Sequence, residues 1–149
     1  MPTYTDVKKM PYSAKQMFDL VADVEAYPDF LPWITKAVIP KREEFNFTAD
    51  LTIGYKFFHD QYTSKVILKP SQRIDVEYVN GPFKHLKNYW VFHPISETEC
   101  EVEFYIDFQF NASLLEGFIT PIFSEAVKTI INAFKKRAEE IYPSTFSVG

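Results

Sequence analysis

Cysteine and glycine are scarce in this chain, and each shortage removes a class of site. The single Cys100 cannot form an internal disulfide or a multi-cysteine zinc site. The four glycines form no glycine-rich loop that could cradle a phosphate group. We therefore expect Cys100 to be a small buried hydrophobic residue, which fits a reducing compartment.

An excess of positive charge and a long apolar run are also missing. Lys and Arg number 16 against 20 Asp and Glu, so the net charge is -4. Proteins that bind nucleic acid usually carry a basic surface, and we therefore expect no DNA partner. No run of about 18 apolar residues could span a bilayer, and residues 3–7 resemble a strand rather than a targeting signal. We expect a cytoplasmic protein, with at most a peripheral contact at the inner membrane.

Aromatic residues, by contrast, are abundant. They make up 17% of the 149 residues, and the 15 Phe are unusual because Leu normally dominates globular cores. The length and the 46% hydrophobic content fit one folded domain that covers residues 1–149. Rigid rings should fill the interior of this domain or line a space within it.

Two short helices are predicted near the N-terminus. Ser13 and Gln16 have the spacing of a capping box, which predicts a helix from about Ala14 to Ala22. A second short helix or turn should cover Val24 to Leu31. It ends at two X-Pro pairs, because the residue before proline is pushed away from helical geometry.

Residues from Trp33 to Phe110 alternate between apolar and polar positions. Phe45 to Phe57 show this most clearly, with every second residue apolar. Such alternation is typical of antiparallel strands with one face in solvent. Turn signals at residues 69–71, 80–82 and 93–96 divide the stretch into about six strands.

The pattern then changes to helical spacing. Apolar residues recur every three or four positions from Leu115 to Ile141, which predicts a helix of about 25 to 29 residues. Because Pro121 lies inside this stretch, the helix should either kink there or follow a separate short turn over residues 114–120. One helix cannot cover so many strands unless the sheet curves around it. The sequence therefore predicts an α+β domain in which a curved antiparallel sheet wraps a long C-terminal helix.

The residues predicted to face the interior are unsuited to acid–base catalysis. The strand carboxylates, such as Asp75, Glu103 and Asp107, fall on the outward positions, and no cluster of metal ligands can be drawn. His59 and Asp60 are adjacent on a strand and should point to opposite faces. The polar residues on the inward positions are neutral: Tyr55, Tyr62, Tyr78, Asn88 and Trp90. We predict no catalytic and no metal site, whereas periodicity alone leaves a ligand pocket and a filled core equally open.

Two segments of the chain resemble a known family. Val24–Trp33 (VEAYPDFLPW) and Gly81–Phe92 (GPFKHLKNYWVF) are similar to two signature segments of the coenzyme Q-binding proteins, within the START-related, polyketide cyclase-like superfamily. The resemblance covers the whole chain and implies a helix-grip fold. It also implies a hydrophobic tunnel that binds ubiquinone or a similar polyprenyl lipid, a chaperone-like role in respiration, no catalysis and no cofactor. Ile34 and Lys84 stand where many relatives carry Cys and Arg.

The resemblance and the inward positions together give a set of candidate ligand-binding residues. The resemblance places Tyr27, Pro28, Phe30, Leu31, Pro32 and Trp33 at an entrance, and Phe83, Leu86, Trp90 and Phe92 on the inner wall. The strand and helix periodicity adds Ala49, Leu51, Tyr55, Val76, Tyr78, Asn88, Phe104, Phe108, Phe118 and Phe123. The entrance and the start of the long helix would form an apolar mouth that touches a membrane.

Two other functions remain open. A similar bacterial branch is described as a toxin that blocks the association of ribosomal subunits, so a ribosome is the alternative partner. The wider superfamily includes polyketide cyclases and aromatases, which makes an enzyme the third hypothesis.

Overall fold

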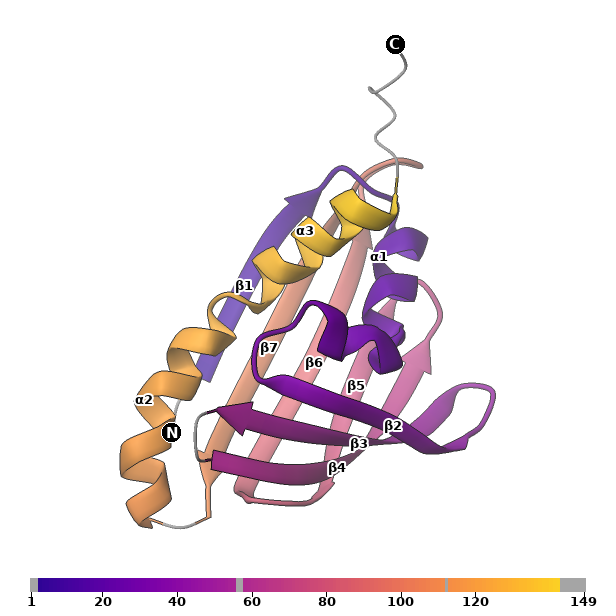
Figure 1. Ribbon diagram of the computed structural model, residues 1–149. Helices are drawn as coiled ribbons and strands as arrows, with labels where there is room; N and C mark the ends of the chain where they lie inside the picture. Colours follow the sequence, from indigo (N-terminus) through magenta and orange to yellow (C-terminus); the bar gives the residue numbers. More distant parts are fainter. Residues whose placement is uncertain (1–2, 56–57, 112, 143–149) are drawn as a thin grey trace.

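The computed structural model describes residues 3–55, 58–111 and 113–142. One antiparallel sheet and four helical segments make up this part of the chain (Figure 1). In chain order they are β1 (Thr3–Met10), α1 (Ala14–Ala22), η1 (Val24–Asp29), β2 (Ile34–Arg42), β3 (Asn46–Tyr55), β4 (Phe58–Lys69), β5 (Arg73–Asn80), β6 (Phe83–Pro94), β7 (Cys100–Phe110), α2 (Ser113–Val127) and α3 (Ile130–Ile141).

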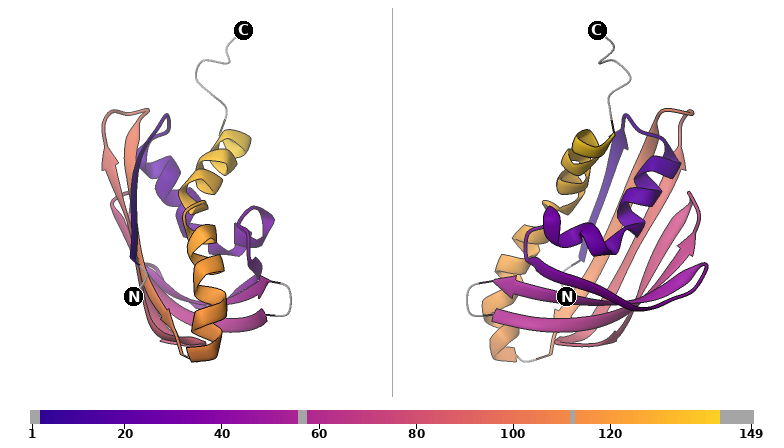
Figure 2. Two further views of the ribbon diagram at one scale, coloured as in Figure 1. Left: turned by 90° about the vertical axis from the view of Figure 1, so that its left-hand side faces the viewer. Right: turned by 45° about the vertical axis from the view of Figure 1, so that its right-hand side comes forward.

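The sheet curves strongly, as the sequence predicted. Its seven strands follow the order β1-β7-β6-β5-β4-β3-β2, so that β1 and β2 form the two edges. In Figure 1, β3 and β4 run nearly horizontally, whereas β6 and β7 run steeply from bottom to top. All the helical segments lie on the concave side (Figure 2). The α+β architecture with a curved antiparallel sheet is therefore confirmed.

The alternation of apolar residues correctly identified the concave face. β7 is the clearest case, because every second residue from Cys100 to Phe110 is buried. On β3, the residues Phe47, Ala49, Leu51 and Ile53 are buried in the same way. Phe45 does not follow its predicted position, since it lies before β3 begins and is 51% exposed.

The predicted single C-terminal helix is two helices, and the break is not at Pro121. Pro121 lies within α2, and between Ser113 and Ile141 the α-helix is interrupted only at Lys128 and Thr129. There, the Thr129 amide and hydroxyl both donate to the Ala126 carbonyl, at 3.0 and 2.7 Å. A continuing α-helix would use that carbonyl to accept from residue 130. The two hydrogen bonds from Thr129 to the Ala126 carbonyl thus take the place of the bond from the residue 130 amide.

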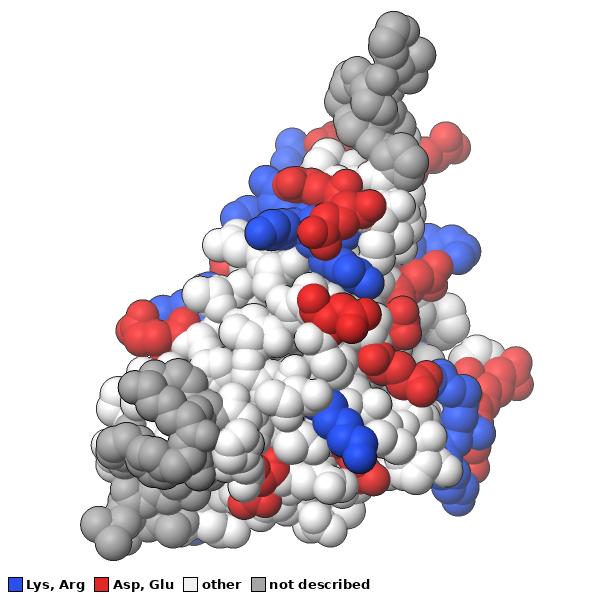
Figure 3. Space-filling view, viewed as in Figure 1, with Lys and Arg blue, Asp and Glu red and all other residues white. Residues whose placement is uncertain are grey.

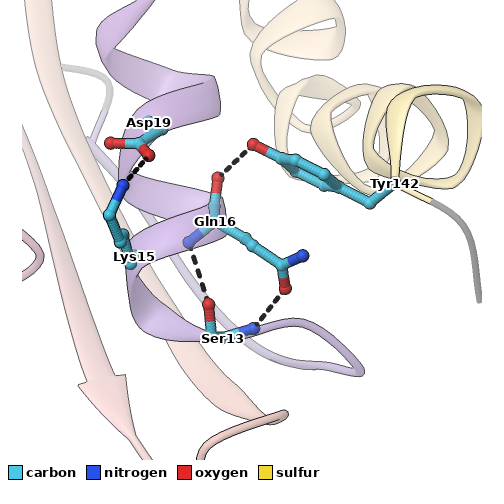
Figure 4. Close-up of polar contacts among 5 residues, drawn as sticks. All are labelled: Ser13, Lys15, Gln16, Asp19 and Tyr142. Atoms are coloured by element: carbon cyan, nitrogen blue, oxygen red, sulfur yellow. Dashed lines mark hydrogen bonds and ion pairs between the residues drawn. The ribbon is translucent and has the colours of Figure 1, made fainter. Parts of the chain in front are cut away.

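The capping box of α1 forms as predicted (Figure 4). The Ser13 hydroxyl accepts from the Gln16 amide at 3.0 Å, and the Gln16 side chain accepts from the Ser13 amide at 2.9 Å. The Tyr142 hydroxyl donates to the Gln16 carbonyl at 2.8 Å, which joins α1 to the end of α3. This contact fixes the two ends of the helical layer against each other.

Removing the cap should weaken the whole domain. We expect Ser13→Ala to lower the free energy of unfolding by about 1 kcal/mol, because the Gln16 amide at the start of α1 loses the Ser13 hydroxyl that accepts from it. Urea denaturation followed by circular dichroism measures the change. Lys15→Ala is the control, since it removes only the exposed ion pair with Asp19 and should leave stability near that of the wild type. Equal stability of Ser13→Ala and the wild type would contradict the role of the cap.

Candidate functional site

A cavity of about 110 Å³ lies between the concave face of the sheet and the helices. Four helical segments and six strands contribute to its wall, together with the residues between η1 and β2. The lining residues are Val21, Val24, Tyr27, Leu31, Pro32, Trp33, Ile34, Ala49, Leu51, Tyr62, Ser64, Val66, Ile74, Val76, Asn88, Trp90, Phe104, Ile106, Phe123, Ala126, Val127, Ile130 and Phe134. Most of these side chains are apolar, as expected for a small-molecule pocket.

The structure brings together about half of the predicted ligand-binding residues. Those that line the cavity are Tyr27, Leu31, Pro32, Trp33, Ala49, Leu51, Val76, Asn88, Trp90, Phe104 and Phe123. They come from η1 and the residues after it, from four strands and from α2. Residues far apart in the sequence therefore meet around one space.

Seven predicted residues do not line the cavity: Pro28, Phe30, Tyr78, Phe83, Leu86, Phe92 and Phe108. Most of them fill the core beside it. The Phe83 ring stacks on Phe110 with centroids 4.6 Å apart, and Phe92 packs edge-on against Phe18 of α1 at 5.7 Å. Alternation along a strand shows which face is inward, but it does not show whether a ring meets a space or another ring. The side chains of Tyr55 and Phe118 lie outside the described part of the structure.

Several lining residues were missed by the sequence-based prediction. The helices add Val21, Val24, Ala126, Val127, Ile130 and Phe134, and the strands add Ile34, Tyr62, Ser64, Val66, Ile74 and Ile106. The strand residues share the inward positions of their predicted neighbours, so the same signal could have found them. Ala126, Val127, Ile130 and Phe134 come from α2 and α3, on the two sides of the break at residues 128–129, which the sequence-based prediction did not place.

An aromatic cluster closes the cavity between η1 and α3. The Phe134 ring lies edge-on to Tyr27 and Phe30 of the η1 region, with centroids 5.4 and 5.1 Å apart. The same ring also packs edge-on against Trp90 of β6, with centroids 4.9 Å apart. The Arg137 guanidinium lies 5.2 Å from the centre of the Phe30 ring and 3.8 Å from the Asp29 carboxylate. These contacts hold η1 against α3.

Trp33 closes the cavity on the other side of η1. Its ring packs edge-on against Phe123 of α2, with centroids 5.4 Å apart. The backbone of Trp33 has a φ of 76°, which is uncommon for a residue other than glycine. The Gly54 amide donates to the Trp33 carbonyl at 2.8 Å and so supports this conformation. Backbone strain of this kind often occurs at ligand sites.

The polar groups of the lining are neutral hydroxyls and amides. The Tyr27 hydroxyl donates to the Val21 carbonyl, and the Asn88 amide donates to the Tyr105 carbonyl at 2.8 Å. Burial raises the pKa of Tyr62, and burial, with nearby Tyr62 and Asp23, raises the pKa of Tyr27. Both tyrosines are therefore protonated at neutral pH. Among the described lining residues there is no carboxylate, imidazole or guanidinium.

The ionisable residues considered in the sequence lie elsewhere. His85 is 3.2 Å from Asp107, and His93 is 3.1 Å from Glu103, both on the convex face of the sheet. Burial raises the pKa of the Cys100 thiol to about 11, so the thiol is protonated at neutral pH. In residues 3–55, 58–111 and 113–142, no three His, Cys, Asp or Glu side chains are placed to hold a metal ion. No helix in these ranges is long and apolar enough to cross a bilayer.

Comparisons with known proteins agree with this fold. The chain is 36% identical to the Ribosome association toxin RatA of Escherichia coli (strain K12) over 142 residues, which cover 95% of this chain and 90% of that protein. It is 29% identical to the mitochondrial Coenzyme Q-binding protein COQ10 homolog B of Xenopus laevis over 143 residues, 93% of this chain and 59% of that one.

The fold also matches a solved structure of an enzyme. The Zhui aromatase/cyclase from Streptomyces sp. R1128 superposes with a TM-score of 0.82 at 15% identity, covering 97% of this chain and 98% of that chain. Residues 10–135 match the family model described as "Polyketide cyclase / dehydrase and lipid transport". This range includes α1, η1, the six strands after them, α2 and the first half of α3. The chain therefore belongs to the polyketide cyclase / dehydrase and lipid transport family.

Proposed function

We propose that this protein binds a hydrophobic molecule with a ring-sized head, such as an isoprenoid quinone, and carries it without chemical change. The observation that supports this most directly is the cavity, whose apolar wall contains a few neutral polar groups. Similarity to a coenzyme Q-binding protein favours a quinone within this class. Because the polar groups of the described lining are neutral, they suit binding better than acid–base catalysis. This favours a carrier over the cyclase or aromatase alternative.

The size of the cavity limits how such a ligand can bind. A cavity of about 150 Å³ in another protein holds benzene, whereas drug-sized ligands occupy roughly 300–1,000 Å³. The 110 Å³ seen here suits a single ring but not a polyprenyl tail. A quinone must therefore displace part of the wall, or leave its tail outside.

We place this displacement in α2. α3 is held to η1 and β6 through Phe134 and Arg137, whereas the break at Lys128 and Thr129 separates it from α2. Movement of α2 would separate Phe123 from Trp33 and open the cavity there. It would also have to break the contacts of the Phe123 ring with Phe108 and Phe110 of β7, at 4.9 and 5.5 Å between centroids. Pro32 is exposed at this mouth, which is where a peripheral membrane contact would form.

A second candidate function is action on the ribosome. The 36% identity to Ribosome association toxin RatA, over nearly the whole chain, is the observation that favours it. On the face shown in Figure 3, charged residues gather over α3 and leave a largely uncharged area below it. The basic residues of α3 are Lys135, Lys136 and Arg137, and Arg137 is paired with Asp29 and Glu140. Lys135 and Lys136 are therefore the candidates on α3 for contact with ribosomal RNA.

Ligand binding can be measured directly, because both tryptophans of the chain line the cavity. Titration with a quinone that carries a short isoprenoid tail should quench their fluorescence and saturate. Ala49→Leu should prevent this quenching by filling the space, and should change the free energy of unfolding by less than about 1 kcal/mol. The lack of a saturable signal with any tail length would count against quinone binding.

Ala138→Leu is the matched control for the cavity variant. Ala138 and Ala49 are both buried, but only Ala49 lines the cavity. Enlarging Ala138 should overpack α3 and destabilise the domain by about 1–3 kcal/mol. If both variants were destabilised equally, the space beside Ala49 would be too small to receive a ligand group.

Burial of the cavity tyrosines predicts a loss of stability at high pH. The folded pKa of Tyr27 and Tyr62 is raised above the unfolded value of about 10, so their contribution is complete below pH 10 and falls above it. The free energy of unfolding of Tyr62→Phe should therefore fall less steeply with rising pH than that of the wild type between about pH 9 and 11. Urea midpoints across this range provide the measurement. An unchanged slope would show that solvent reaches the Tyr62 hydroxyl.

The ribosomal function predicts an effect on subunit association. Excess protein should reduce the fraction of intact ribosomes formed from purified subunits in sucrose-gradient sedimentation. Lys135→Glu/Lys136→Glu should weaken the effect, whereas Ala49→Leu should leave it unchanged because Ala49 is buried in the cavity. Unaltered subunit association with wild-type protein would exclude this candidate.

A further inference from the structure

Ser64 is an exception among the buried residues of this protein. Among the residues that the structure describes, Ser64 is the one polar residue that is buried in the core, and it is 1% exposed. Its hydroxyl has no hydrogen-bond partner and lies in the lining of the cavity. A buried hydroxyl without a partner lowers stability, and such groups usually find one. An unsatisfied donor at this position indicates a role other than packing.

The surroundings of Ser64 leave space above its hydroxyl. Ser64 lies in the middle of β4, where it pairs with Ala49 on β3 and with Tyr78 on β5. The Tyr78 hydroxyl is occupied elsewhere, because it accepts from the Phe83 amide at 3.0 Å. Ala49 is too small to cover its neighbour. The Ser64 hydroxyl therefore faces the cavity rather than another polar side chain.

A second residue with a hydroxyl lines the cavity from the same strand as Ser64. Tyr62 precedes it by two positions, so both side chains leave the same face of β4. The Tyr62 ring is held edge-on by Phe83, with centroids 5.5 Å apart. Within the described residues, the Tyr62 hydroxyl makes no hydrogen bond. Burial raises its pKa, so the hydroxyl keeps its proton and can donate it.

We propose that the Ser64 and Tyr62 hydroxyls form the polar end of the cavity and donate hydrogen bonds to a carbonyl oxygen of the ligand. This inference rests on the proposed binding function and specifies the ligand group that it recognises. An anionic head would find no cation in the described lining, and a cationic head would find no carboxylate. A neutral acceptor oxygen can accept hydrogen bonds from the Ser64 and Tyr62 hydroxyls, and no charged group of the ligand is then buried. Ketones, quinones and esters belong to this chemical class, and hydrocarbons do not.

Two ring-sized probes separate carbonyl recognition from quinone transport. Cyclohexanone and methylenecyclohexane have nearly the same shape, and only cyclohexanone has an acceptor oxygen. Ligand-observed nuclear magnetic resonance should show that the wild type prefers cyclohexanone by about three- to tenfold, as expected for one or two net hydrogen bonds. Methylenecyclohexane should still bind, because the rest of the wall is apolar.

Three variants locate the source of this preference. Ser64→Ala and Tyr62→Phe should each reduce the preference for cyclohexanone, while the affinity for methylenecyclohexane stays the same or rises. Ser64→Ala should also keep or raise the melting temperature, because it removes an unsatisfied buried hydroxyl. Thr120→Val is the matched control: the Thr120 hydroxyl is likewise buried without a partner, but it does not line the cavity. This variant should keep the full preference.

The outcomes distinguish the two proposals. A preference that persists in both Ser64→Ala and Tyr62→Phe would overturn the assignment of the polar end. Equal wild-type affinity for the two probes would overturn it as well. If the preference is present and depends on Ser64, but no tailed quinone binds, then the polar end is supported and the quinone-carrier function fails.

Discussion

The contacts of one side chain, Phe134, hold the separate parts of this fold in position. Its ring meets Tyr27 and Phe30 from the segment after α1 and Trp90 from the middle of the sheet. Aromatic pairs of this kind each contribute about 0.5–1.5 kcal/mol beyond the burial of their area. They fix the distance between α3 and the sheet. Since straight helices cannot follow a strongly curved sheet, a fixed distance leaves part of the concave face uncovered, and the cavity occupies that part.

The relatives of this chain show how differently one fold can be used. They include a ribosome association toxin, a coenzyme Q-binding protein and, among solved structures of the same fold, an aromatase/cyclase. Function is determined by the residues placed on a fold rather than by the fold itself. In this chain, the described residues around the cavity are apolar or neutral, and the charges lie on the outer surface. This distribution separates an interior suited to a hydrophobic molecule from an exterior that can meet a larger partner.

The fold was more predictable from the sequence than the site. Alternation identified the concave face of β3 and β7, and the spacing of Ser13 and Gln16 gave the start of α1, because both signals are local. The division of the last helix was not predictable from Pro121, since a hydrogen bond from Thr129 determines it. The cavity depends on distances between elements, which no local pattern contains. For this reason the sequence predicts the same inward orientation for Ala49 and Phe83. In the structure, Ala49 lines the cavity, whereas the Phe83 ring packs against Phe110.

The open edge of the sheet at β2 has a consequence for the behaviour of the protein in concentrated solution. An edge strand offers unpaired backbone groups on which a strand from another molecule could form. In β2, the pairing with β3 shifts register between Ile34 and Lys36 and again between Val38 and Lys41, and Pro40 lies within the second shift. Proline lacks an amide hydrogen, and the lysines carry charge along the same edge. These irregularities make β2 a poor template for edge-to-edge aggregation, so the sheet can remain open without recruiting further strands.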